Sequence, residues 1–301
     1  MSVPAAYLTV ILIWSTTPLA IKWSSIGVGY EFGAAARMFI GLLALLAIIR
    51  LRGQSLPWNR HARLVYLVSG ISLFLAMSLV YWSAQFIPSG WISVIFGLSP
   101  LITSALATII LHENNLTAGR LIGMLLGLAG LGVVFAEGLT LAGAAWMGVV
   151  GMTVGALIHS LGAVLLQKLK TDIPAITITA GSLIVATPAF VLNFVLMRSW
   201  PEQIGTATLL SIVYLALLGS TLGFPLYYYL LKKLNAERVA LIALITPVTA
   251  LLVGALLNNE TINTRVWLGT ALILSGLAIY EYGKHLRFAK KWQKRWNQRP
   301  L

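Results

Sequence analysis

Apolar runs of about 20 residues recur along the whole chain, and each is long enough to cross the roughly 30 Å hydrocarbon layer of a membrane as a helix. Hydrophobic residues make up 58% of the 301 residues and charged residues only 10%, whereas an ordinary soluble domain carries about 25% charged residues. A soluble protein of this size could not cover its surface with so few charges. The sequence therefore predicts an all-α integral membrane protein.

Charges, glycines and prolines divide the apolar sequence into ten predicted transmembrane helices. They lie near residues 5–23, 32–50, 64–86, 91–111, 118–136, 144–167, 175–197, 206–231, 238–257 and 266–283. The first run lacks the basic segment and cleavage site of a secretory signal, so we expect it to be a retained span. The chain has no cysteine, which excludes disulfides and thiolate metal sites, and no metal or cofactor site is predicted.

Lysine and arginine fall mainly on one side of these helices. With the N-terminus in the cytoplasm, 17 of the 21 lie on the cytoplasmic side, and the remainder are Lys22, Arg37, Arg198 and Arg265. The positive-inside rule then predicts a multi-pass protein of a bacterial inner membrane with both termini cytoplasmic. The net charge of +13 is thus a topology signal, and no nucleic-acid partner is predicted.

The end of the chain, residues 284–301, forms a basic tail with an apolar face. Phe288, Trp292 and Trp296 are spaced four residues apart, and lysine and arginine occupy most of the other positions. This spacing predicts an amphipathic helix held by anionic lipid headgroups. A disordered basic tail is the alternative.

The second half of the chain repeats the first. Ser99-Pro100 aligns with Thr246-Pro247 and Glu113 with Glu260 at an offset of 147, while Gly123 and Gly130 align with Gly269 and Gly276 at an offset of 146. Each half contains five predicted helices, and because five is odd the two halves enter the membrane from opposite sides. We therefore predict two inverted five-helix repeats, residues 1–138 and 139–283, with a site between them near the middle of the membrane.

The sequence resembles the drug/metabolite transporter superfamily, specifically the EamA-type ten-helix permeases, over nearly all of residues 5–283. The resemblance rests on "WSTTPLAIK" in the first helix, "AARMFIGLLALL" in the second, and two helices that end in glutamate and precede glycine-rich helices. It implies a secondary transporter that exports small metabolites, amino acids or toxic compounds by alternating access. It does not specify the solute, and it leaves open whether the protein is a monomer or a dimer.

Prolines lie inside several of the predicted helices, where each removes a backbone hydrogen bond and bends the helix. Such bends are tolerated in membranes where the freed carbonyls face protein or a water-filled cavity. We expect helix-bend or gating roles for Pro18, Pro100, Pro225 and Pro247. The alternative is that proline is simply common in membrane helices.

Aromatic and hydroxyl side chains gather in the helices that the repeat brings together. A wall of this kind suits an organic solute, although Trp and Tyr also mark the membrane interface. Of the three consecutive tyrosines 227–229, one or two at most can face a site. The predicted substrate-binding residues are Trp14, Thr17, Tyr81, Trp82, Ser99, His159, Tyr228 and Thr246.

His159 is the one ionisable residue predicted well inside a helix, where such residues are usually functional. It is a candidate proton site, and the alternatives are binding of a carboxylate or a hydrogen bond to a neighbouring serine. Lys22 and Arg37 are expected to reach the interface, and the alternative for Lys22 is attraction of an anionic group. Glu113 and Glu260 are expected to cap helix ends or to pair with Arg120 and Arg265, so no acidic residue is predicted at the middle of the membrane.

Other classes of function fit the sequence less well. A proton-coupled multidrug or toxic-compound exporter would need His159 as its proton carrier. A membrane-embedded lipid-modifying enzyme would need clustered catalytic groups, whereas the four histidines are scattered along the chain. A channel would favour a continuous polar lining. We therefore expect a non-enzymatic exporter of small organic solutes, acting either as a facilitator or with proton coupling.

Overall fold

The fold was obtained as a computed structural model that describes residues 2–112, 117–140, 143–197, 200–234 and 236–282, without the side chains of Phe224, Tyr228, Leu231, Lys232 and residues 236–241. Every element in the described residues is helical. The predicted lipid-binding tail, residues 284–301, and Glu113 lie outside the described residues. The helices are α1 (Val3–Trp23), α2 (Tyr30–Leu51), α3 (Arg60–Ser83), α4 (Ser89–Phe96), α5 (Ser99–Ile110), α6 (Ala118–Thr140), α7 (Ala145–Lys168), α8 (Ala175–Met197), α9 (Thr206–Tyr214), the π-helix η1 (Leu215–Leu222), α10 (Gly223–Lys233), α11 (Ala236–Asn258) and α12 (Thr264–Tyr282).

Eight helical segments of the described chain are long and apolar enough to cross a membrane. Six of them are the single helices α1, α2, α3, α6, α7 and α8. The other two are composite, since α4 and α5 together form one, and α9, η1 and the start of α10 form another. The two remaining helices, α11 and α12, coincide with the last two predicted apolar runs.

The outer surface of the bundle is apolar. Leucine and isoleucine side chains on several helices are more than half exposed, among them Leu12, Leu43, Ile109, Leu128 and Leu196. A water-soluble protein rarely exposes so much contiguous apolar surface. Lipid tails are the solvent that this surface suits.

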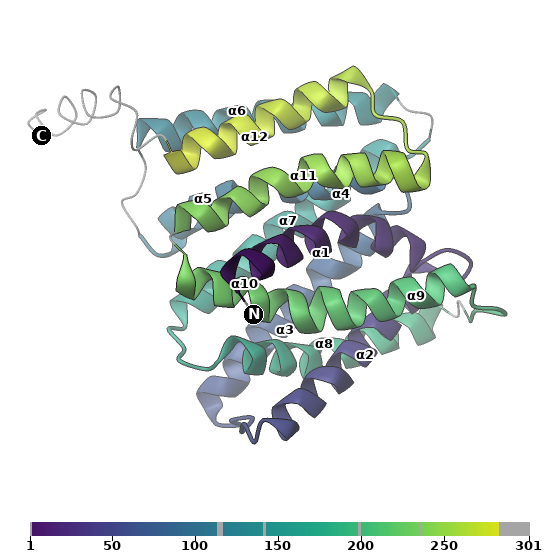
Figure 1. Ribbon diagram of the computed structural model, residues 1–301, viewed down its shortest axis with the longest axis vertical. Helices are drawn as coiled ribbons and strands as arrows, with labels where there is room; N and C mark the ends of the chain where they lie inside the picture. The colour runs from purple at the N-terminus through teal and green to yellow at the C-terminus, as the bar shows by residue number, and fades with distance from the viewer. Residues whose placement is uncertain (1, 113–116, 141–142, 198–199, 235, 283–301) are drawn as a thin grey trace, which may run out of the picture.

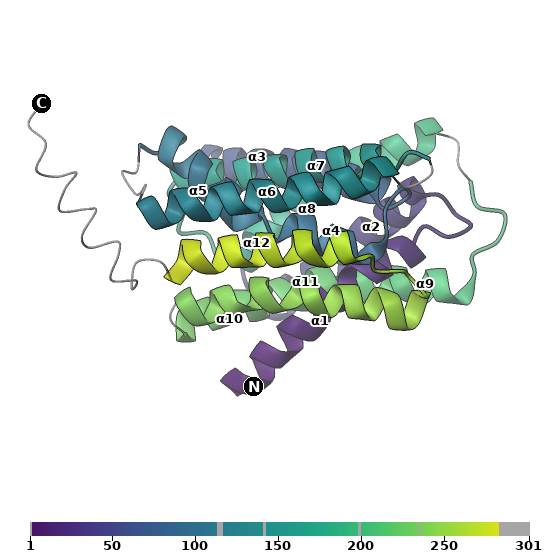
Figure 2. The same cartoon turned by 90° about the horizontal axis from the view of Figure 1, so that it is seen from above.

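The helices form two layers. Seen from above, one layer contains α3, α5, α6 and α7, and the other contains α1, α9, α10 and α11 (Figure 2). Between elements far apart in the sequence, α6 pairs with α12, α3 packs on both α7 and α8, α2 packs on α8, and α11 packs on both α1 and α4 (Figure 1).

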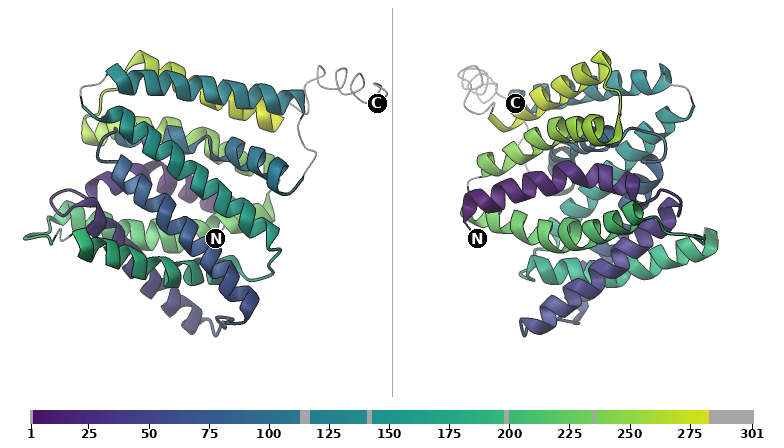
Figure 3. Two further views of the ribbon diagram at one scale, coloured as in Figure 1. Left: turned by 180° about the vertical axis from the view of Figure 1, so that it is seen from behind. Right: turned by 45° about the vertical axis from the view of Figure 1, so that its right-hand side comes forward.

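Glycines bring α6 and α12 into close contact along one seam, which is visible from the front and from behind (Figures 1 and 3). A Cβ atom added to Gly123 would lie 2.5 Å from the carbonyl oxygen of Gly276, and one added to Gly130 would lie 2.6 Å from that of Gly269. Real Cβ atoms do not approach so closely. Small residues allow this backbone contact, which drives helix association where water provides no hydrophobic force.

Candidate functional site

A cavity of about 430 Å³ lies at the end of the bundle where α5, α7 and α12 end and α6 begins. Its volume falls within the range of about 300–1,000 Å³ that is usual for small-molecule sites. Five helices contribute its walls. The lining residues are Ser99, Pro100, Thr103, Ser104, Ala107, Arg120, His159, Ala163, Gln167, Tyr227, Tyr280 and Glu281.

A larger depression, of about 620 Å³, lies outside the bundle between residues 27–29 and residues 200–203. Both of its walls are loops that connect helices. It contains none of the predicted site residues and reaches no helix interior. The cavity between the helices is therefore the candidate site.

A helix break forms the inner wall of this cavity. Pro100 has no N–H to donate to the carbonyl of Phe96, four residues earlier, and the helix is interrupted between Phe96 and Ser99. The hydroxyl oxygen of Ser99 is buried and has no hydrogen-bond partner in the part of the chain that the structure describes. A buried, unpartnered hydroxyl at a cavity wall is suited to receive a hydrogen bond from a polar solute or from water.

His159 lies on α7 and faces the same cavity. Its ring lies 5.2 Å, centroid to centroid, from the ring of Phe96 at an interplanar angle of 49°. The neighbouring Ser160 donates to the carbonyl of Ser99 at 3.3 Å, which ties α7 to the start of α5. No hydrogen bond to the ring nitrogens of His159 is found among the described residues, so the alternative of a bond to a neighbouring serine is not seen there.

Tyr227 forms the wall on the side of α10, and the predicted Trp14 contacts it without lining the cavity. Tyr227 lines the cavity, and its ring lies 4.9 Å from that of Trp14 at an angle of 40°. Tyr227 and Tyr229 both pack against one small apolar cluster, but of these two only Tyr227 lines the cavity. The side chain of the predicted Tyr228 lies outside the described residues.

The wide turn of η1 precedes Pro225, which lies near the start of α10. Proline cannot donate a helical hydrogen bond, and the Thr221 hydroxyl donates to the carbonyl of Ala216, five residues earlier, at 2.9 Å. π-helical turns of this kind are frequent at functional sites. The π-helix η1 thus directly precedes α10, the helix that carries Tyr227.

Several predicted residues do not line the cavity. Trp82 packs edge-on against Phe86, with ring centroids 4.9 Å apart, and contacts Gly151 of α7. Thr246 and Pro18 are buried within α11 and α1. Pro247 lies inside a continuous α11, and a Cβ atom added to Gly97 would lie 3.4 Å from it.

Tyr81 and Thr17 belong to a second polar cluster, around Arg37 of α2. Arg37 was expected to reach the interface, and this expectation was wrong, since its side chain is buried with only 6% of the residue exposed. Its Nε donates to the hydroxyl of Ser220 at 3.2 Å, and one terminal nitrogen donates to the hydroxyl of Tyr81 at 3.5 Å. A Cβ atom on Gly219 would lie 3.5 Å from Arg37 and 3.9 Å from Thr17.

Sequence reasoning did not assign Arg120, Tyr280 and Glu281 to the site, because all three lie near helix ends. In the structure the guanidinium of Arg120 lies 5.2 Å above the ring of Tyr280, whose hydroxyl donates to Ser104. These contacts depend on the pairing of α6 with α12. The sequence repeat aligns those two helices, but it does not state that they touch.

The opposite end of the bundle is sealed by Glu260. Its carboxylate accepts hydrogen bonds from the backbone N–H and the hydroxyl of Ser89, both at 2.9 Å, and from the N–H of Gly90 at 3.4 Å. Asn258 donates to it at 2.8 Å, and Lys22 lies 3.9 Å away. Glu260 therefore caps the N-terminus of α4, a contact with the other half of the chain that was not predicted.

Of the two roles expected for Glu260, it takes that of a helix cap and does not pair with Arg265. Arg265 pairs instead with Glu137 at 3.5 Å, and Asn263 donates to the same carboxylate. The ammonium group of Lys22, a residue expected to reach the interface or attract an anionic group, donates to the carbonyl of Ile87 at 3.0 Å and lies 3.9 Å from Glu260. The charged residues at this end thus join helices to one another.

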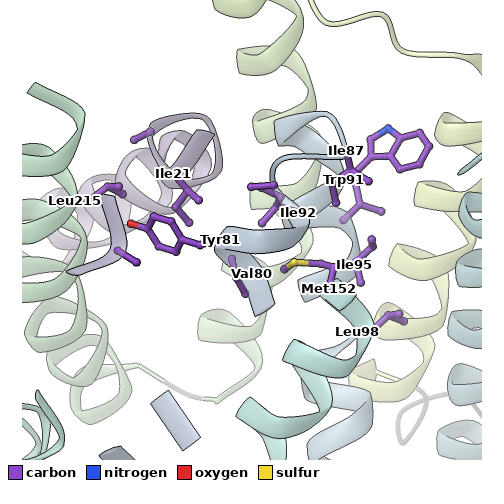
Figure 4. Packing of buried hydrophobic residues seen from close by; sticks show 14 of the residues in the cluster. Ile21, Val80, Tyr81, Ile87, Trp91, Ile92, Ile95, Leu98, Met152 and Leu215 are labelled. Carbon is purple, nitrogen blue, oxygen red and sulfur yellow. The ribbon is translucent and has the colours of Figure 1, made fainter. Parts of the chain in front are cut away.

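An apolar plug separates the sealed end from the cavity. It consists of buried side chains from α1, α3, α4, α7, η1 and the loop before α4, namely Ile21, Val80, Tyr81, Ile87, Trp91, Ile92, Ile95, Met152 and Leu215 (Figure 4). Helix α4 connects the three regions in order. Its first residues contact Glu260, Ile92 and Ile95 are buried in the plug, and Phe96 contacts His159 at the cavity.

Comparison with known proteins gives one family and several relatives. The model of the EamA-like transporter family matches residues 3–136 and again residues 146–281. The uncharacterized inner membrane transporter YedA of Escherichia coli (strain K12) is 26% identical, over 93% of this chain and 90% of that protein. A probable amino-acid metabolite efflux pump of the same organism is 26% identical, over 94% and 96%.

A solved crystal structure has the same fold. It matches with a TM-score of 0.66 and 21% sequence identity, over 96% of this chain and 99% of the other. At this identity the match concerns the fold alone.

Proposed function

The chain belongs to the EamA-like transporter family, and from this premise we propose that it is a secondary transporter that exports small organic metabolites, amino acids among them, by alternating access. The observation that carries the proposal is the contrast between the two ends of the bundle. A cavity is present at one end, and the apolar plug and Glu260 close the other. This arrangement corresponds to one state of an alternating-access cycle.

In the proposed topology the chain crosses the inner membrane ten times. The eight long segments are completed by α11 and α12, and residues 1–138 and 139–283 form inverted repeats of five spans. The distribution of lysine and arginine supports a cytoplasmic position for both termini and, with them, for the open end of the cavity.

The glycine seam supports the inverted repeat. The repeat aligns Gly123 with Gly269 and Gly130 with Gly276. In the structure Gly123 contacts Gly276, and Gly130 contacts Gly269. Exchanging each glycine for its aligned partner converts the first contact into the second, which is the reciprocity expected at a two-fold axis.

The cavity chemistry supports a zwitterionic solute. Its walls carry the hydroxyl of Ser99, the imidazole of His159 and the aromatic rings of Tyr227 and Tyr280. A guanidinium group and a carboxylate, those of Arg120 and Glu281, are also present. A wall with both signs of charge and flat apolar faces is complementary to an amino acid. One relative is named as a probable amino-acid metabolite efflux pump, which agrees with this substrate class.

We expect the purified protein in liposomes to move labelled neutral amino acids faster than protein-free liposomes do. Flux is measured with and without a pH gradient, with a lipophilic cation as the competing substrate. Movement of the cation alone, with no amino-acid flux, would contradict the proposed substrate class and favour the multidrug alternative.

The same assay distinguishes proton-coupled transport from facilitated diffusion. If His159 is the proton site, a pH gradient drives accumulation in the wild type, and the folded His159→Ala variant loses that accumulation. Flux that only equilibrates, whatever the gradient, identifies a facilitator. His159 is then a residue that contacts the solute.

Filling the cavity tests whether it is the route. Ala163 is exposed at the cavity wall, so the Ala163→Trp variant places an indole ring where the solute is proposed to bind. We expect flux to fall at least about tenfold, which corresponds to about 1.4 kcal/mol. The matched control is Leu157→Trp on the same helix, because Leu157 is 45% exposed and lies outside the cavity. Equal flux in both variants would show that the solute passes elsewhere.

A further inference from the structure

Arg37 is a buried cation for which the described part of the chain provides no ion pair. Its only hydrogen bonds there go to two neutral hydroxyl groups, those of Ser220 and Tyr81, at 3.2 and 3.5 Å. Lys22 pairs with Glu260 and Arg265 with Glu137, and neither ion pair includes Arg37. A permanent positive charge is therefore held in the interior by weak, uncharged partners.

A charge in this position requires an explanation. A guanidinium group has five N–H donors and no acceptor, and two long hydrogen bonds leave most of that capacity unused. Ionisable residues inside a membrane bundle are unfavourable, and they usually mark the pathway of a substrate or ion. The natural partner of a guanidinium is a planar anion that accepts two parallel hydrogen bonds.

The surroundings of Arg37 lead back to the cavity. The ring of the cavity-lining Tyr227 contacts that of Trp14 at a tilt of 40°, and a Cβ atom on Gly223 would lie 3.5 Å from the indole nitrogen of Trp14. One helical turn before Gly223, Gly219 lies beside both Arg37 and Thr17. Arg37 therefore lies beside Gly219. Gly219 precedes the cavity-lining Tyr227 by eight residues of the same span, which is about 12 Å at the α-helical rise of 1.5 Å per residue.

The segment that carries this cluster is irregular. Gly219 and Ser220 both belong to η1, and π-helical turns are often associated with functional sites. Tyr81 is fully buried, and its ring lies beside Ile21 and Leu215 at the edge of the apolar plug (Figure 4). The cluster thus shares Tyr81 with the plug and lies on the route that a solute would follow when the plug separates.

We infer that Arg37, together with the hydroxyl groups of Tyr81 and Ser220, forms a carboxylate-binding site that the solute occupies during transfer past the plug. The site rests on the proposed function. In the state seen here, the guanidinium of Arg37 is hydrogen-bonded to the two hydroxyl groups. When the plug separates, a solute carboxylate accepts hydrogen bonds from the remaining N–H groups of Arg37. The ammonium group and side chain of the solute then face Trp14 and Tyr227.

A purely structural role is the competing explanation, because Arg37 also joins α2 to α3 and η1. The two roles differ in their dependence on the solute. A residue that only holds helices together affects the flux of every solute alike. A residue that binds a carboxylate distinguishes an acid from its uncharged amide.

The test compares L-phenylalanine with L-phenylalaninamide in liposomes. We expect the wild type to prefer the acid, and Arg37→Gln to lower acid flux at least about tenfold while leaving amide flux unchanged, as expected for the loss of a charge-assisted hydrogen bond. Arg37→Lys keeps the charge but loses the bidentate geometry, so it should retain part of the preference. The control is Arg265→Gln, because the Arg265 side chain is 61% exposed.

Each outcome separates the two proposals. Equal loss of acid and amide flux in folded Arg37→Gln, or no preference for the acid in the wild type, overturns the carboxylate site and leaves the transporter in place. No wild-type flux of either compound contradicts the proposed function itself. If Arg37→Gln does not fold, Tyr81→Phe and Ser220→Ala take its place, and they must raise the KM for the acid and not for the amide.

Discussion

Replacing Gly130 with alanine is expected to destabilise the bundle by about 1–3 kcal/mol, the range observed for overpacked interiors. The added methyl group would lie 2.6 Å from the carbonyl oxygen of Gly269 and 2.8 Å from the side chain of Ile273. The first of these atoms belongs to the backbone of α12, so it cannot turn aside. The two helices must therefore separate, and the whole seam between α6 and α12 loses contact.

The matched control lies two residues further along the same helix. A Cβ atom on Gly132 meets nothing within 4 Å, so Gly132→Ala should be neutral or should stabilise the helix by up to about 1 kcal/mol through its higher helix propensity. Thermal unfolding in detergent compares the two variants. Equal midpoints would show that backbone contact between Gly130 and Gly269 does not hold the seam.

The positions of the helices could be predicted well, because each depends on a local property. The eighth predicted run, 206–231, coincides with α9, η1 and α10, and the seventh, 175–197, has the same limits as α8. Apolar length alone sets these limits in a membrane. It was less predictable whether a predicted span is one continuous helix or is broken in two. Pro100 and Pro247 occupy aligned positions, yet the first lies at a helix break and the second lies inside a continuous helix.

The site was predicted only in part, because it depends on contacts between helices. Ser99, Pro100 and His159 were selected by residue type, and the structure brings all three to one cavity. Trp82 was also selected by residue type, as an aromatic side chain next to Tyr81. It contacts Gly151 of α7 and not the cavity, because neighbouring residues on a helix point in different directions. Arg37 was assigned to the interface because sequence position alone does not reveal which helices surround it.

Removing the carboxylate of Glu260 is expected to open the sealed end. The Glu260→Ala variant loses the capping hydrogen bonds to Ser89 and Gly90 and the favourable position of a negative charge at the N-terminus of α4. Hydrogen bonds to a charged group contribute about 1.5–3 kcal/mol and an N-cap about 1 kcal/mol. A loss of about 2 kcal/mol shifts the balance between closed and open ends about 30-fold.

The chain has no cysteine, so single introduced cysteines can report which end is open. Ile92→Cys lies in the apolar plug and Ala163→Cys at the cavity wall. With Glu260 present, a water-soluble thiol reagent should modify position 163 and spare position 92. With Glu260→Ala, modification at position 92 should accelerate about 30-fold, and modification at position 163 should slow as the cavity closes.

A third cysteine separates a shift between two states from general loosening. Ala76 is fully buried on α3, away from the sealed end, and packs near Gly155 of α7. If Glu260 acts only on the sealed end, Ala76→Cys stays protected in both backgrounds, because rigid helices move past one another without unfolding. Joint exposure of positions 76 and 92 would instead make Glu260 a determinant of folding. Unchanged labelling at position 92 would mean that the apolar plug closes this end without the cap.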